Sequence, residues 1–373
     1  MVDNGIRIIM CVDLDYFYAQ VEEIRDPSIK GKPVIVCVYS GRTKDSGAVS
    51  TCNYIARNSG VRSGMPIALA KRIMAEHPEA VFLPMDHEYY ESVSNRVMAL
   101  LKEGSPRFEQ ASIDEAYLDA TQQSAGDYAL ARDLSEKLKA EIFDTEHLTC
   151  TIGIGPNKLV SKMAVDSKKP NGLTVILPGK VREYFDTLPI GKLFGIGPKI
   201  EKKLASLRIL TVAQLAAFDV QILSRNFGEK MGPQLRDAAL GIDEEPVRER
   251  EIEQFSRIVT LKENALSFTF EEILAPLAKD LSNKLVAANM TCQSIGIIAI
   301  TSQLRTKTRS RKTDNPTDSD SEILEVASDL FRIFFAEEKL ETEWTPVRRV
   351  GIRLFSLKKR DGDIREKSLT DFL

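Results

Sequence analysis

Cysteine, histidine and tryptophan are scarce in this sequence, whose 373 residues include five cysteines, three histidines and one tryptophan. The cysteines form no C-x-x-C pair and the histidines no H-E-x-x-H cluster, which excludes a disulfide scaffold and argues against a structural zinc site. No apolar run approaches the roughly 20 residues that cross a bilayer, and the N-terminus lacks the apolar core of a signal peptide. We therefore expect a cytoplasmic chain with reduced thiols.

Phosphate-binding glycine motifs are also missing. The sequence contains no G-x-x-x-x-G-K-[ST] run, and Gly153-Ile154-Gly155 lacks the spacing of G-x-G-x-x-G. We expect this segment to form a plain turn. The sequence therefore disfavours nucleotide binding of the P-loop or Rossmann type.

The composition is that of an ordinary globular protein, with 43% apolar and 28% charged residues. At roughly 150 residues per domain, the length predicts two to four domains. The net charge of −3 argues against a polyanionic partner, but two runs, 291–313 and 347–360, contain many bases and no acid. The bases are Arg305, Lys307, Arg309, Arg311 and Lys312 in the first run and Arg348, Arg349, Arg353, Lys358, Lys359 and Arg360 in the second. Such clusters indicate a nucleic-acid-binding face, although a solvated charged surface explains either run alone equally well.

The first half of the chain alternates strand and helix patterns. Apolar or alternating segments predict strands at 6–13, 32–38, 48–51, 108–113, 116–119 and 150–155, and helical spacing predicts helices at 16–25, 53–58 and 128–144. The segments 108–113 and 116–119 flank Asp114 and Glu115, so we expect an antiparallel hairpin with these acids at its turn. This order favours an α+β sheet with helices on one face.

The second half predicts three further parts. Short helical segments broken by glycine and proline indicate a small all-helical module at 178–242, followed by a charged linker at 243–254. Strands at 255–261, 295–303 and 349–357 and helices at 270–288 and 321–336 predict a second α+β domain, in which 314–320 forms a polar loop tip.

Acidic residues stand at two of the predicted strand ends. Asp13 and Asp15 project to the same side if their strand continues, and Asp114 and Glu115 lie at the hairpin turn. If these ends are neighbours in the sheet, the carboxylates repel one another unless cations are present. Oxygen ligands without histidine or cysteine suit Mg²⁺ or Mn²⁺, and paired ions of this kind perform nucleotidyl transfer. Helix caps and turn residues are the simpler explanation of each acid taken singly.

Several runs resemble motifs of the Y-family translesion DNA polymerases, in particular the DinB-like (DNA polymerase IV) branch and its archaeal members. The runs are 12–22 (VDLDYFYAQVE), 52–57 (CNYIAR), 112–119 (SIDEAYLD) and 169–172 (KPNG), in the family's order. The resemblance spans essentially the whole chain and implies a multidomain α+β right-hand polymerase. Its implied parts are a palm (1–24 and 85–177), fingers (25–84), a small helical thumb (178–242), a linker (243–254), an α+β little finger (255–358) and a tail (359–373).

The resemblance also implies an active site. Asp13, Asp114 and Glu115 match the catalytic, metal-binding acids, and the main-chain carbonyl of Leu14 matches a further ligand for two Mg²⁺ ions, with Mn²⁺ as a possible substitute. Asp15 matches a position that is not usually a ligand. Thr51, Tyr54, Arg57 and Lys169 match residues that hold the incoming triphosphate, and Tyr18 matches the steric gate beneath the nucleotide sugar.

The same resemblance implies contacts with DNA and with a sliding clamp. Phe194 to Lys199 resembles a helix-hairpin-helix in which Gly195, Gly197 and Lys199 approach a DNA phosphate, although an interhelical turn remains an alternative. In the little finger, the implied DNA contacts are Arg305, Lys307, Arg309, Arg311, Arg348 and Arg349. The C-terminal residues resemble a clamp-binding peptide in which Leu369 and Phe372 match, Glu366 replaces glutamine and Leu373 replaces an aromatic residue.

The sequence thus predicts a monomeric, template-directed DNA polymerase that performs low-fidelity translesion synthesis from dNTPs on primer-template DNA. Because no second acidic cluster suggests an exonuclease, we expect no proofreading. Two alternatives remain: a nucleotidyl cyclase, for which the thumb hairpin and basic final domain would have no purpose, and a noncatalytic DNA-binding scaffold tethered to a clamp.

Overall fold

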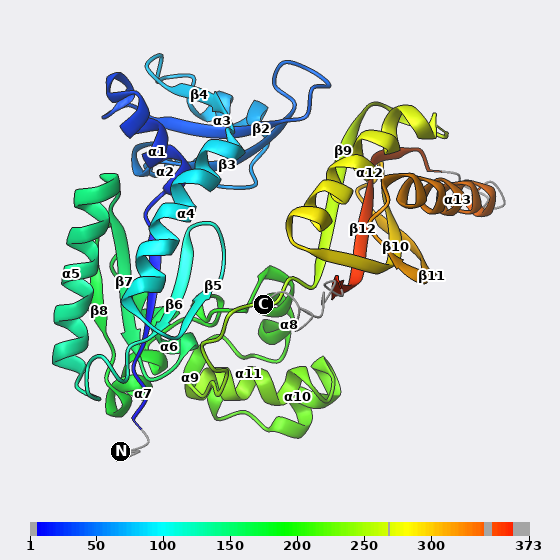
Figure 1. Cartoon of the computed structure of the whole chain (residues 1–373). Coiled ribbons are helices and arrows are strands. Elements are labelled where there is room, and N and C mark those ends of the chain that lie inside the picture. Colours follow the sequence, from blue (N-terminus) through cyan, green and yellow to red (C-terminus); the bar gives the residue numbers. More distant parts are fainter. Residues whose placement is uncertain (1–5, 268, 339–344, 361–373) are drawn as a thin grey trace, which may run out of the picture. The chain divides into compact units, whose positions relative to one another are not determined.

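The computed structural model of the chain describes residues 6–267, 269–338 and 345–360 (Figure 1). Its contacts divide the chain into two compact units. The first contains Met1–Val38 and Ala48–Arg250, and the second contains Tyr39–Gly47 and Glu251–Leu373. All the acids of the predicted active site belong to the first unit.

A five-stranded sheet forms the centre of the first unit, with the strand order β5-β6-β1-β7-β8. These strands are β1 (Ile9–Leu14), β5 (Phe108–Gln110), β6 (Glu115–Asp119), β7 (Cys150–Gly155) and β8 (Leu173–Val175). β1 lies in the middle because its apolar residues are buried on both faces, as the continuous apolar run predicts. β5 and β6 form the predicted antiparallel hairpin, with Glu115 as the first residue of β6.

Helices cover both faces of this sheet, so the expectation of helices on one face is wrong. α4 (His87–Gly104) and α5 (Tyr128–Glu146) share a core with Met10 and Val12. α6 (Lys158–Asp166) packs its Val165 against Ile9 and Cys11, which face the other way. Since successive residues of β1 point to opposite faces and both sets are apolar, each face requires a cover.

A smaller sheet with the order β3-β2-β4 follows the first strand and helix of the chain. The elements of this region are α1 (Phe17–Arg25), η1 (Pro27–Ile29), β2 (Val34–Tyr39), β3 (Gly47–Cys52), α2 (Tyr54–Asn58), α3 (Ile67–Ile73) and β4 (Val81–Pro84). Asn53 caps α2 by accepting a hydrogen bond from the amide of Ala56 (3.1 Å), which fixes where that short helix begins.

The module after β8 is all-helical, as predicted. It contains η2 (Pro178–Lys180), α7 (Val181–Asp186), η3 (Ile190–Lys192), α8 (Pro198–Ser206), α9 (Val212–Ala216), α10 (Val220–Phe227) and α11 (Met231–Leu240). Residues 241–253 then form neither helix nor strand, and Gln254, the last residue of the predicted linker, already begins the next strand.

The second unit is a four-stranded antiparallel sheet with two helices. Its sheet order is β11-β10-β12-β9, from β9 (Gln254–Ala265), β10 (Met290–Thr301), β11 (Thr306–Thr317) and β12 (Val347–Lys359), and its helices are α12 (Phe270–Ala287) and α13 (Asp320–Glu338). The expectation of a loop tip at 314–320 is wrong for its first residues, because β11 continues to Thr317. β11 is an edge strand, and its register against β10 shifts between Cys292 and Ser294, so Pro316 lies at a bulge where no ladder hydrogen bond is lost.

Candidate active site

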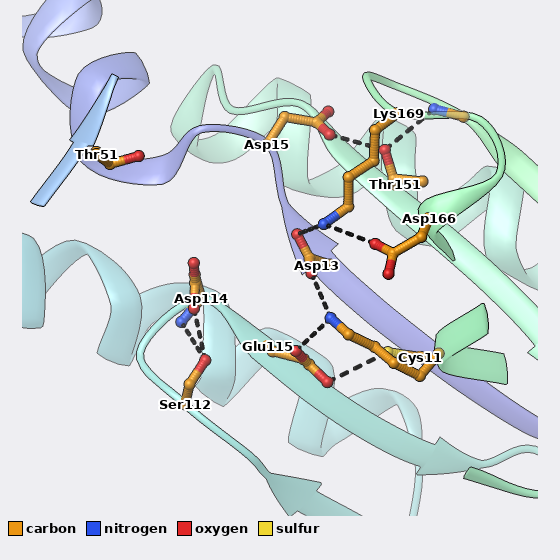
Figure 2. A network of polar contacts seen from close by, with 12 residues as sticks. Cys11, Asp13, Asp15, Thr51, Ser112, Asp114, Glu115, Thr151, Asp166 and Lys169 are labelled. Atoms are coloured by element: carbon orange, nitrogen blue, oxygen red, sulfur yellow. Dashed lines mark hydrogen bonds and ion pairs between the residues drawn. The ribbon is translucent and has the colours of Figure 1, made fainter. Parts of the chain in front are cut away.

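Two neighbouring strands bring the predicted acids together. Asp13 of β1 is the direct partner of Glu115 in β6, and directly opposed residues of an antiparallel pair lie on the same face. Asp114 immediately precedes β6, and its carbonyl accepts a hydrogen bond from the amide of Leu14 (2.8 Å). Residues about one hundred positions apart in the sequence therefore meet at one end of the sheet (Figure 2).

Two lysines contact these acids. Nζ of Lys162, from α6, is 2.9 Å from Oδ2 of Asp13 and 2.6 Å from Oε2 of Glu115. Nζ of Lys169 is 2.7 Å from Oδ1 of Asp13 (Figure 2). Burial alone would lower the pKa of Lys162, but the charges of Asp13 and Glu115 raise it above its usual value. The site therefore stabilises positive charge between the carboxylates.

Asp114 stands slightly apart from the other two acids. Its carboxylate accepts a hydrogen bond from the hydroxyl of Ser112 (2.5 Å) rather than from a lysine (Figure 2). Burial raises the pKa of Asp114, and the nearby charges of Asp13 and Glu115 raise it further. This carboxylate is the member of the group that most lacks a counter-charge.

Asp15 does not project beside Asp13, because β1 ends at Leu14. Its buried carboxylate accepts hydrogen bonds from the hydroxyls of Thr149 (2.9 Å) and Thr151 (2.7 Å) and from the amide of Asn171 (2.8 Å). Both oxygens are thereby engaged. Asp15 therefore anchors the loop that carries Lys169.

The residues expected to hold a triphosphate form two groups. Arg57 lies over the ring of Tyr54, 5.0 Å from its centroid, and its guanidinium contacts the hydroxyl of Thr51 (3.5 Å). The hydroxyl of Thr51 is turned towards the side on which Asp13 and Asp114 lie (Figure 2). Lys169 belongs to the acid cluster instead, through Asp13.

Tyr18, the expected steric gate, lies in α1. Its ring stacks on that of Tyr90 from α4, with centroids 4.6 Å apart and an interplanar angle of 18°. Burial raises the pKa of Tyr18, and so does the charge of Asp114. Tyr18 is therefore held rigidly by Tyr90 and lies within electrostatic reach of the acids.

The expected DNA contacts of the helical module lie at a surface turn before α8. Gly195 has a φ of +88°, a conformation that favours glycine, and Gly197 is the N-cap of α8. A Cβ atom added at either glycine would meet no atom within 4 Å, so both backbones face open space. Lys199 is exposed in the first turn of the same helix.

The expected DNA contacts of the second unit lie in β11, in the turn before it and at the start of β12. Arg309 pairs with Glu337 of α13 (2.7 Å) and Arg311 with Asp329 (3.4 Å), so both point to the helix-covered face. Lys307 precedes Arg309 by two residues in β11, so its side chain lies on the same face as theirs. The backbone of Arg305 closes the turn before β11 with that of Thr301 (2.9 Å). Arg348 and Arg349 lie at the start of β12, where the register against β9 shifts. Their predicted DNA contacts stay predictions. Leu369, Phe372 and Leu373, the predicted clamp contacts, lie outside the described residues.

The sequence reading missed Lys162. Three buried residues of α6 precede it and three follow it, and the side chain itself is 11% exposed. A lysine in an otherwise apolar helix is normally assigned to the solvent-exposed face of that helix, since lysines are rarely buried unless they are paired. No signal in the sequence distinguishes it from Lys158 one turn earlier.

In the part of the chain that the structure describes, no group of three or more histidine, cysteine, aspartate or glutamate side chains is arranged to hold a metal ion. The donor chemistry nevertheless fits a hard divalent cation, because Asp13 and Glu115 already bind ammonium groups and Asp114 lies beside them. All these donors are oxygens.

Within the described residues, no helix is long and apolar enough to cross a membrane.

Comparison with known proteins gives consistent matches along the chain. Residues 12–166 match the model of the impB/mucB/samB family, residues 253–369 its C-terminal domain, and residues 191–243 the thumb domain of DNA polymerase-iota. The chain is 44% identical to DNA polymerase IV of Methanosarcina acetivorans over 98% of this chain and 99% of the relative. It is 41% identical to DNA polymerase IV of Nitrosopumilus maritimus over 95% of this chain and 97% of the relative.

Solved structures agree. A Y-family DNA polymerase chimera, Dbh-Dpo4(243-245)-Dbh, matches with a TM-score of 0.85 and 37% identity, covering 94% of this chain and 98% of that one. DinB from Sulfolobus solfataricus matches with a TM-score of 0.66 and 36% identity, covering 93% and 98%. The chain therefore belongs to the Y-family of DNA polymerases and is a DNA-directed DNA polymerase. The predicted resemblance and the predicted α+β polymerase fold are confirmed.

Proposed function

We propose that this polymerase extends a primer across damaged template DNA by two-metal-ion nucleotidyl transfer, with low fidelity and without proofreading. The observation that carries the proposal is the meeting of Asp13 and Glu115 across β1 and β6, with Asp114 beside them and two lysines on their oxygens. Such a concentration of charge at a sheet end is costly unless it serves a cationic ligand. DNA, dNTPs and the translesion role are supported by the DNA polymerase IV relatives and by a structural neighbour described as an insertion ternary complex.

Asp13, Asp114, Glu115 and the carbonyl of Leu14 would hold divalent cations, with Mg²⁺ as the proposed cofactor and Mn²⁺ as a substitute. When bound, the cations would activate the primer 3′-hydroxyl and stabilise the departing pyrophosphate. The protein's own part is to orient these oxygens, and the β1–β6 pairing does so for Asp13 and Glu115.

The triphosphate would be held by Thr51, Tyr54, Arg57 and Lys169. Arg57 is suited to this role because its planar group offers a fork of donors to phosphate oxygens. Its present contact with Thr51 is long at 3.5 Å, so phosphate oxygens would compete for its donors. Lys169 would exchange its contact with Asp13 for one with the triphosphate.

Tyr18 would exclude ribonucleotides by occupying the space of a 2′-hydroxyl, since Tyr90 prevents its ring from yielding. Gly195, Gly197 and Lys199 would grip the DNA backbone, aided by the bases of the second unit. The proposed palm, fingers, thumb and little finger keep the boundaries given above. We further propose a cytoplasmic monomer that binds a sliding clamp through its C-terminal peptide.

Primer extension with Mg²⁺ tests the proposal. Asp114→Asn or Glu115→Gln should lower single-nucleotide incorporation by at least ~100-fold, because losing a metal ligand costs more than the 10–100-fold loss of a supporting residue. Binding of primer-template DNA, measured by fluorescence anisotropy, should stay within about twofold of wild type, since none of the proposed DNA contacts is altered. Arg107→Gln is a matched control, because Arg107 pairs with Asp119 at the other end of β6 (3.1 Å). Undiminished extension by both acid variants would remove these residues from the site. DNA binding without any extension by wild type would favour the scaffold alternative.

A further inference from the structure

Lys162 places a buried ammonium group between carboxylates from two strands. Nζ lies within hydrogen-bond distance of both Asp13 (2.9 Å) and Glu115 (2.6 Å). Burying a lysine costs free energy unless it is closely paired, so the two contacts explain why it is retained inside the fold. Both partners are residues to which the proposed function assigns divalent cations. Lys162 thus supplies positive charge where cations would otherwise be required.

The backbone that carries Lys162 packs closely against the sheet. α6 lies so close to β7 that a Cβ on Gly153 would be 2.1 Å from the carbonyl oxygen of Ser161, the residue before Lys162. Asn157 fixes the start of the helix by accepting from the amide of Val160 (2.8 Å). The side chain of Lys162 itself is flexible. An incoming cation must therefore compete with the ammonium group for the same oxygens.

The balance of charge makes this competition unfavourable for a cation without a nucleotide. The three acids Asp13, Asp114 and Glu115 are opposed by the two ammonium groups of Lys162 and Lys169. A divalent cation placed beside those lysines experiences like-charge repulsion. A triphosphate brings its own negative charge and removes that repulsion.

We propose that Lys162 is a positioning residue that holds Asp13 and Glu115 together in the metal-free protein and competes with divalent cations for their oxygens. The inference rests on the proposed function of the site. It follows that Lys162 weakens cation binding before a nucleotide arrives, while keeping the two strand ends from repelling each other.

The test uses the full chain and Mn²⁺ alone, with binding followed by loss of the free-ion EPR signal. Lys162→Met should bind Mn²⁺ about tenfold more tightly than wild type, because a neighbouring like charge is removed. In EDTA, the unfolding temperature of Lys162→Met should be lower than that of wild type. Excess Mg²⁺ should raise the unfolding temperature of Lys162→Met by more than it raises that of wild type. Lys162→Arg, which keeps the charge, should bind Mn²⁺ no more tightly than wild type.

Lys158→Met is the matched control. Lys158 lies one turn earlier on α6 and pairs with buried Glu109 (3.0 Å), so its loss should destabilise the chain equally with and without Mg²⁺. If Lys162→Met does not fold, Lys162→Gln gives the same comparison. Unchanged Mn²⁺ affinity, or an equal loss of stability in EDTA and Mg²⁺, would show that Lys162 is only structural and would overturn the inference. If the Asp13→Asn protein binds Mn²⁺ as tightly as wild type, the proposed function is wrong, and the inference that rests on it is wrong too.

Discussion

Gly153 is the position where one added methyl group should disturb the active site most clearly. In β7 it pairs with Cys11 of β1 and Thr174 of β8, and it faces α6. A Cβ there would lie 2.1 Å from the carbonyl oxygen of Ser161, 2.5 Å from the amide nitrogen of Val165 and 2.9 Å from the Cβ of Ala164. Two of these atoms belong to backbone, so no side-chain rotation relieves the contact. Gly153→Ala must therefore displace α6.

The size of the displacement sets the expected effect. Ordinary van der Waals contact begins near 3.4 Å, whereas the added Cβ would lie 2.1 Å from the carbonyl oxygen of Ser161. The helix must therefore shift by about 1.3 Å. Overpacking of this kind costs roughly 1–3 kcal/mol. For a unit of this size, about 2 kcal/mol corresponds to an unfolding temperature lower by roughly 4–8 °C. Because α6 carries Lys162, and a misplacement of 1 Å costs ~10²-fold in rate, incorporation should also fall by one to two orders of magnitude.

Calorimetry and single-nucleotide incorporation kinetics measure both effects. Gly179→Ala is the matched control, since a Cβ at Gly179 meets no atom within 4 Å, and both of its properties should match wild type. A Gly153→Ala protein with wild-type unfolding temperature and wild-type turnover would refute the close packing of α6 on the sheet and, with it, the account of how Lys162 is placed.

Three further predictions follow from other contacts. Tyr18→Ala should incorporate ribonucleotides at least ~10-fold more readily against dNTPs, because steric rejection is lost; unchanged sugar discrimination in competition assays would contradict the gate. Burial alone would raise the pKa of Glu109, but hydrogen bonds from Arg250 and Lys158 lower it, so its contribution to stability is present above the unfolded pKa and is lost as pH falls through the folded one. Denaturant titrations from pH 7 to pH 3 should therefore show a smaller loss of unfolding free energy in Glu109→Gln than in wild type, and parallel curves would exclude this contribution. Deleting residues 369–373 should preserve extension of short primers but abolish stimulation by a sliding clamp, and full stimulation of the truncated chain would contradict the peptide assignment.

The position of the acids at strand ends could be predicted from the sequence because it depends on local pattern. β1 is continuous and apolar, and the hairpin at β5 and β6 alternates in polarity. Both end in acids, so the convergence of Asp13 with Glu115 needs only that the two strands be neighbours. That adjacency itself came from the resemblance to a family, since periodicity does not order strands within a sheet.

The glycines of β7 show where local pattern misleads. The apolar pattern predicted a strand at 150–155, whereas the glycines of Gly153-Ile154-Gly155 suggested a turn; the strand is right and the turn is wrong, because all three residues lie in β7. Glycine is weak in strands unless another backbone approaches closely, and here α6 does so at Gly153 and Gly155. This close approach depends on the tertiary structure, and the sequence of the segment alone does not predict it.

The edge strand of the second unit and Lys162 were missed for related reasons. Asp314, Asn315 and Pro316 indicate a loop, but pairing with β10 extends β11 to Thr317. Lys162 resembles a surface lysine until Asp13 and Glu115 are placed opposite it. In both cases a partner distant in the sequence overrides the preference of the segment.

The most direct test of the central claim is a crystal structure of the protein with primer-template DNA, a nonhydrolysable dNTP analogue and Mn²⁺, recorded at a wavelength where manganese scatters anomalously. We expect anomalous peaks in contact with carboxylate oxygens of Asp13, Asp114 and Glu115, and we expect Nζ of Lys162 to be withdrawn from at least one of its two present partners. A nucleotide bound elsewhere, or anomalous peaks that touch none of the three acids, would contradict the central claim.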